Sequence, residues 1–133
     1  MLEQKDFIHS AVVGDPEYNS SGFRMRKEIN EIDLDNYIIF AGSSHTTGVG
    51  VKYEEMFSHL VSAVMKVDCV NLALGGGGID AVEHNLLLWH FRYKQPPKAI
   101  IVEWPIYQRY IKHIDNQENM TPAGNWSDPE FVT

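Results

Sequence analysis

Three short apolar runs alternate with two segments of helical periodicity along the middle of the chain. The runs are predicted strands at Tyr37–Phe40, Cys69–Ala73 and Ala99–Trp104. The segments between them, about 53–66 and 80–93, are predicted helices because apolar side chains recur there at three- and four-residue spacing. Strands that alternate with helices predict a parallel sheet wound by right-handed crossovers, and therefore a three-layer α/β fold.

Each predicted helix carries its own signals. Apolar residues at helical spacing, typical of a helix that packs one face on a core, mark the first helix at Phe57, Leu60, Val61 and Val64. In the second helix, Asp80 followed by Glu83 predicts an N-cap with a capping box. The second helix presents Val82, Leu86 and Trp89 on one face, and Pro96-Pro97 stops it.

The flanking segments are more polar. Residues 1–36 contain turn signals, such as Gly14-Asp15-Pro16, and are interpreted as a leader that wraps the core. Residues 37–113 form the predicted core, and residues 114–133 read as a polar C-terminal tail, as loop or frayed chain. A chain of 133 residues makes one domain.

Composition narrows the classes of partner. A net charge of −7, from 11 Lys and Arg against 18 Asp and Glu, excludes the basic surface of a nucleic-acid binder and disfavours an anionic membrane. One cysteine, Cys69, excludes an internal disulfide framework and a Cys-rich zinc site. The N-terminus is too charged for a signal peptide, and no apolar run reaches the ~18 residues of a membrane span. We therefore expect a soluble protein, cytoplasmic by default.

Two glycine-rich loops follow the first two strands, at Gly42–Gly48 and Leu74–Gly78. Ligands of parallel α/β sheets bind beyond the carboxyl ends of the strands, where both loops fall. The first loop is not a phosphate-binding P-loop because Val49 stands where the motif needs Lys, and the second lacks the last glycine of a dinucleotide fingerprint because position 80 is Asp. A serine on the first strand-to-helix turn, flanked by backbone N–H donors, fits a nucleophile better.

These loops carry a resemblance to a known family. Gly42-Ser43-Ser44-His45-Thr46-Thr47-Gly48 resembles the first block, G-D-S-x-T-x-G, of the SGNH, or GDSL-like, hydrolases, with Ser43 in place of Asp. The segment Asn71-Leu72-Ala73-Leu74-Gly75-Gly76 resembles the second block. Upstream, Asn19-Ser20-Ser21-Gly22-Phe23-Arg24 followed by Glu28 resembles the segment that precedes the first block. The resemblance runs from about residue 19 to residue 105.

The resemblance implies a flavodoxin-like fold and ester hydrolysis, with acyl or acetyl groups removed from a carbohydrate, lipid or small ester. The acyl-enzyme would form on Ser44, and the N–H groups of Ser44 and Gly76 would hold the oxyanion. No metal or cofactor is implied. The substrate site is predicted to include His45, Gly75, Glu103 and Trp104.

The chain departs from the family pattern after the third strand. This strand ends in Glu103-Trp104-Pro105, without the Asn of the third block. No Asp stands three residues before any of the 6 histidines, so the D-x-x-H of the last block is missing. The predicted base is His113, the only histidine after strand three, or a histidine of another chain, because adjacent residues such as Ser44 and His45 diverge in a turn.

Two questions stay open at the sequence level. Three strands instead of about five make the fold incomplete at its C-terminal side and leave Ala99–Trp104 as an open apolar edge, which residues 106–133, a second copy or a completing partner chain would cover. The protein is then a small hydrolase, a catalytically silent module that binds a glycan or builds an assembly, or a fragment of a truncated or split hydrolase. The alternative role for Ser44 is a structural one, in which it caps the helix over 53–66 or accepts N–H groups of the turn.

Overall fold

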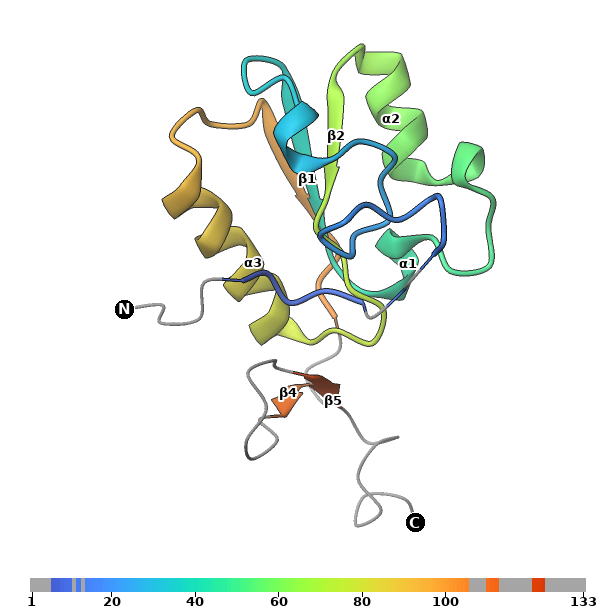
Figure 1. Ribbon diagram of the computed structural model, residues 1–133, viewed down its shortest axis with the longest axis vertical. Helices are drawn as coiled ribbons and strands as arrows, with labels where there is room; N and C mark the ends of the chain where they lie inside the picture. The colour runs from blue at the N-terminus through green and yellow to red at the C-terminus, as the bar shows by residue number, and fades with distance from the viewer. Residues whose placement is uncertain (1–5, 11, 13, 106–109, 113–120, 124–133) are drawn as a thin grey trace.

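The computed structural model describes residues 6–10, 12, 14–105, 110–112 and 121–123. A three-stranded parallel sheet in the order β2-β1-β3 forms its centre (Figure 1). The strands are β1 (Tyr37–Ala41), β2 (Asp68–Asn71) and β3 (Ala99–Val102). All three predicted strands are confirmed, and with them the small, incomplete α/β fold.

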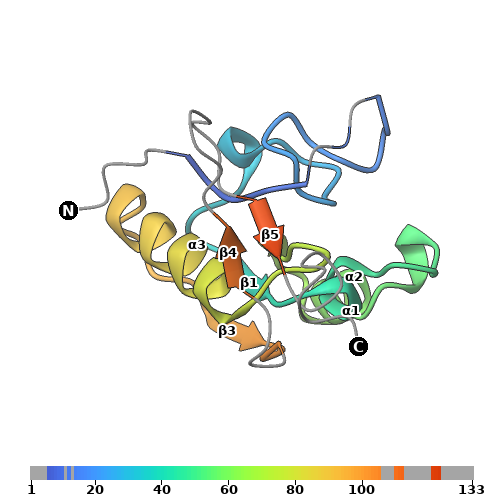
Figure 2. The ribbon, with the colours of Figure 1, turned by 90° about the horizontal axis from the view of Figure 1, so that it is seen from below.

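Two helices cover opposite faces of the sheet (Figures 1 and 2). They are α2 (Phe57–Met65) and α3 (Ile79–Arg92). The helix predicted over 53–66 begins only at Phe57, because its first residues form a separate 3-10 turn, η2 (Tyr53–Glu55). The remaining helical pieces are the 3-10 turn η1 (Ile29–Glu31) and the four-residue α1 (Ser44–Thr47), which follows β1 directly.

The capping box predicted at the start of α3 is wrong. The N-cap is the extended Gly78, so Asp80 lies inside the first turn, where its Oδ1 accepts the N–H of Ala81 at 2.9 Å. The helix begins at Ile79, one residue earlier than the side-chain pattern predicts. Its N-cap, Gly78, has no side chain with which to cap the helix. Asp80 still places negative charge at the positive end of the helix.

Most of the apolar side of helix α2 is exposed. Its buried residues are the small Ser58 and Ser62, whereas the predicted core-facing residue Val64 is 81% exposed. Small side chains let the helix backbone lie close to β2, which explains why serines take the inner positions. Of the apolar set, Phe57 still meets the ring of Phe40 edge-on, at 5.8 Å between centroids.

The main core lies between the sheet and α3, and the N-terminal segment closes it. Its buried members come from the segment before β1, from β1 and the β2 region, and from α3: Phe7, Phe23, Met25, Ile32, Tyr37, Ile39, Val70, Leu72, Leu88 and Trp89. The Trp89 indole N–H donates to the Tyr37 hydroxyl at 3.1 Å, which gives the buried indole its partner. The described part of the segment before β1 is therefore part of the folded unit.

A second, two-stranded antiparallel sheet joins β4 (Tyr110–Lys112) to β5 (Thr121–Ala123). This hairpin lies beyond the carboxyl ends of the parallel strands, with β4 against α3 (Figure 2). The prediction of loop or frayed chain for 114–133 is thus wrong at Thr121–Ala123, where strand pairing overrides the polar composition. In the described part of the chain, no helix has the length and apolar character needed to cross a membrane.

Asn85 offers a direct test of how the N-terminal segment is held. Its buried amide accepts the Ile8 N–H at 2.9 Å and donates to the Ile8 carbonyl at 2.9 Å. Asn85→Ala leaves two buried backbone groups unpaired, so we expect it to lower the free energy of unfolding by about 2–4 kcal/mol. Urea unfolding measures the change, and the exposed Asn30→Ala serves as the control. Equal stability of the two variants would contradict this role of Asn85.

Candidate functional site

The turn between β1 and α1 is held by the carboxylate of Glu103, the residue that follows β3. Ser43 donates to it twice, from its N–H at 3.1 Å and from its hydroxyl at 2.7 Å. Thr46 also donates twice, from its N–H at 3.3 Å and from its hydroxyl at 3.2 Å. One carboxylate therefore fixes both sides of Ser44 in the sequence.

Glu103, just after β3, caps the N-terminus of α1 with its side chain. The first N–H groups of a helix lack intrahelical acceptors and favour negative charge. Burial raises the pKa of Glu103, but the hydrogen bonds from Ser43 and Thr46 outweigh burial and lower its pKa below the ordinary value. The group is therefore ionised at neutral pH. Its carboxylate is committed to this turn, a role that its prediction as a substrate-binding residue did not include.

The structure explains why glycine stands at both ends of the first loop. A Cβ at Gly42 would lie 2.5 Å from the Thr46 hydroxyl oxygen and 3.0 Å from the Glu103 Cβ, so the approach of β3 to the turn needs a glycine here. Gly48 ends α1 in the left-handed conformation, with φ of 78°, and its N–H bonds back to the carbonyls of Ser44 and His45.

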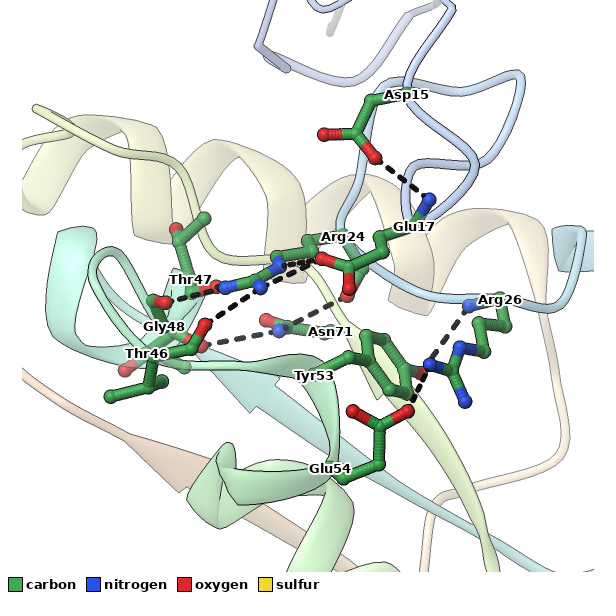
Figure 3. Close-up of polar contacts among 11 residues, drawn as sticks. Asp15, Glu17, Arg24, Arg26, Thr46, Thr47, Gly48, Tyr53, Glu54 and Asn71 are labelled. Carbon is green, nitrogen blue, oxygen red and sulfur yellow. Dashed lines mark hydrogen bonds and ion pairs between the residues drawn. The ribbon is translucent and has the colours of Figure 1, made fainter.

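Arg24 and Asn71 hold the C-terminal side of α1 (Figure 3). The Arg24 guanidinium donates to the Thr47 carbonyl at 3.2 Å, to the Val51 carbonyl at 2.9 Å and to the Gly48 carbonyl, and it pairs with Glu17 at 2.7 Å. The buried Asn71 amide donates to the Thr46 carbonyl at 3.2 Å. The sequence analysis placed Asn71 in the second block but predicted no role for it. Its position at the end of β2, where polar residues reach the neighbouring loops, was the signal that could have indicated this role.

Ser44 is the first residue of α1 and is half-buried. Glu103 takes the N–H groups of Ser43 and Thr46, whereas neither the N–H nor the hydroxyl of Ser44 is hydrogen-bonded within the described residues. The loop after β2 runs beside this turn because the Leu74 N–H donates to the Gly42 carbonyl at 3.0 Å. Gly75 and Gly76 follow directly, and Gly76 adopts a φ of 76°.

No described histidine is hydrogen-bonded to Ser44. His45 is its exposed neighbour in α1. The ring of His84 bonds the Asp6 carbonyl at 3.1 Å, and the ring of His59 lies 5.1 Å from that of Tyr53. His113, the predicted base, is the residue after β4 and lies outside the described residues.

Other chemistry is limited in the described part of the chain. There, no group of three His, Cys, Asp or Glu side chains gathers to hold a metal ion. Burial raises the pKa of Cys69 to about 11, so the thiol stays protonated at neutral pH. Trp104, next to Glu103, is exposed and presents an open aromatic surface.

Comparison with known proteins adds no assignment: no family model, no curated protein and no solved structure matches the chain. The function must therefore be argued from the residues and the geometry of this turn.

The capping role of Glu103 predicts a pH-dependent stability difference. A carboxylate with a lowered pKa stabilises the fold above its unfolded-state pKa and loses this contribution as the pH falls through its folded-state pKa. Glu103→Gln should therefore lower the free energy of unfolding by about 1 kcal/mol at neutral pH, after allowance for solvent screening, and the difference should shrink as the pH falls through the lowered folded-state pKa of Glu103. Urea unfolding across this range measures it.

Glu83→Gln is the matched control because Glu83 is an exposed carboxylate on α3. It should change stability little across the same range. A Glu103→Gln variant as stable as wild type at neutral pH would show that the cap contributes nothing.

Proposed function

We propose that this protein is a serine ester hydrolase of the SGNH type, with Ser44 as nucleophile. The observation that carries the proposal is the arrangement of the turn: Glu103 binds Ser43, just before Ser44, and Thr46, two residues after it, while the Ser44 N–H and hydroxyl are unpaired among the described residues. A nucleophile needs an accessible hydroxyl on a rigid turn, next to backbone donors.

The reaction follows from these groups. A base removes the proton of the Ser44 hydroxyl as its oxygen attacks the ester carbonyl. The N–H groups of Ser44 and Gly76 stabilise the oxyanion, and collapse of the intermediate expels the alcohol, which takes the proton from the base. Water, deprotonated by the same base, then releases the acid and restores Ser44. The Ser44 N–H, which is unpaired among the described residues, and the glycine loop beside the turn support this assignment.

We propose His113 as the base, from this chain or from a second copy. The support is its place in the sequence: β4 ends at Lys112, and the β4–β5 hairpin lies at the same end of the sheet as α1 (Figure 1). Of the described histidines, His84 bonds the Asp6 carbonyl and His59 packs beside Tyr53. His45 is adjacent to Ser44 in sequence, so its side chain points away from the Ser44 hydroxyl in our proposal. This assignment keeps the base on the only histidine that follows strand three.

The proposed substrate is a glycan ester or a small ester. Trp104, 60% exposed and adjacent to Glu103, offers a flat apolar surface against which a sugar ring can pack. The net charge of −7 disfavours strongly anionic substrates and favours a soluble protein. A cytoplasmic location stays a prediction.

A second candidate is a catalytically silent module that binds a glycan at the same edge. The observation that favours it is the lack of any histidine bonded to Ser44 among the described residues. In that case the turn held by Glu103 would present Trp104 and the glycine loop for binding only.

A fluorophosphonate, which reacts covalently with activated serines, separates the two candidates. Intact-mass analysis should show one adduct on the wild type and none on Ser44→Ala. Ser20→Ala, which removes a hydroxyl from the segment before β1, should retain the adduct. His113→Ala should react at least about a hundredfold more slowly if this residue is the base. A wild type that gains no adduct at high reagent concentration would overturn the hydrolase proposal and favour the silent module.

A further inference from the structure

Strand β3 leaves one edge of the parallel sheet open. It pairs with β1 on one side, and no described strand pairs with it on the other. Ile100 is 51% exposed and Ile101 is 37% exposed, whereas every residue of β1 is buried. Parallel sheets are normally covered on both faces, and monomeric proteins protect exposed edges with charges, prolines or bulges. The sequence of β3, Ala-Ile-Ile-Val, contains none of these.

Apolar surface continues from this edge over both faces of the sheet. On the α3 face, Ile100 lies beside Ile39, and together with the α3 residues Leu86 and Tyr93 these two residues line one cavity. This cavity, of about 290 Å³, is also lined by Trp89 and Pro97 and opens on this side.

On the α2 face, Ile101 lies beside Phe40, whose ring contacts the exposed Phe57. The exposed Leu60 follows Phe57 by three residues on the same helix and extends this surface. The exposed apolar residues of α2 therefore extend the apolar surface of β3 on this face of the sheet.

We propose that a second copy of this chain covers this region, with the two β3 strands paired antiparallel about a twofold axis. The axis stands perpendicular to the sheet, so the α3 faces of the two copies lie on one side and the α2 faces on the other. Each apolar surface then meets its own equivalent, as an isologous interface requires. The two sheets become one continuous sheet of six strands, and neither copy retains the open β3 edge.

Charges at the two ends of β3 favour this orientation. The strand is preceded by Lys94 and Lys98, both exposed, and is followed by the partly exposed Glu103. Antiparallel pairing brings Lys98 of one copy beside the Glu103 end of the other copy, whereas parallel pairing would bring like charges together. This local complementarity offsets the repulsion between two chains that each carry a net charge of −7.

The described remainder of the chain does not cover this edge. Strands β4 and β5 pair with each other in a separate sheet, and β4 lies against α3 beyond the carboxyl ends of the parallel strands. The proposal uses residues outside the Ser44 turn, apart from the charge of Glu103, and it does not depend on the proposed hydrolase activity.

Sedimentation velocity of the full chain tests the proposal. The wild type at about 100 µM should sediment as a dimer, and Leu60→Lys and Ile100→Lys should sediment as monomers with unchanged far-UV circular dichroism. Val49→Lys is the matched control, because Val49 is 68% exposed and lies on the loop after α1. It should remain a dimer. Leu60→Lys keeps the test valid if Ile100→Lys fails to fold, since Leu60 lies on the surface of α2 and is 50% exposed.

A charge variant tests the antiparallel orientation. Lys98→Glu should weaken the dimer at least about tenfold, because it places two acidic groups together at each end of the paired strands. A monomeric wild type at this concentration would overturn the proposal and point to coverage by residues 106–133 or by a different protein. A dimer that survives both Leu60→Lys and Ile100→Lys as well as Val49→Lys would place the interface elsewhere and overturn the proposal too.

Discussion

The carboxylate of Glu103 is the contact on which the rest of this site depends. It lies just after β3 and reaches across the sheet edge to the turn after β1, where Ser43 and Thr46 donate four hydrogen bonds to it. Without it, the N-terminal N–H groups of α1 and the buried Ser43 hydroxyl would lose their acceptor. The same contact requires glycine at position 42, because a Cβ there would meet both Thr46 and Glu103.

This arrangement gives the unusual Ser43 a physical meaning. The SGNH family, to which we propose this chain belongs, has an acidic residue at this position, whereas this chain has a serine that donates to the carboxylate of Glu103, just after β3. Negative charge thus still lies at the turn. Glu103 takes the N–H groups of Ser43 and Thr46, and no other described residue accepts the Ser44 N–H, which in our proposal binds the oxyanion. The proposed chemistry and the capping of α1 therefore use different donors of one short helix.

Much of the framework could be predicted from the sequence. The apolar runs located β1, β2 and β3, and the small residues of the first loop located the turn, because both signals are local. The bond between Ser43 and Glu103 could not be predicted, since the two residues are 60 positions apart and meet only when β3 pairs with β1. The exposed apolar side of α2 was also missed, because periodicity reveals that a helix is amphipathic without showing which side meets the sheet. Asp80 was misassigned because Gly78 begins α3 earlier.

The central claim is that the Glu103 carboxylate holds the turn in which Ser44 reacts. The most direct measurement is the second-order rate constant for modification of Ser44 by a fluorophosphonate, compared between wild type and Glu103→Gln at neutral pH, under conditions in which both are fully folded. The account predicts a rate at least about tenfold lower in Glu103→Gln, because the turn loses its charged anchor. Equal rate constants in the two folded proteins would contradict it.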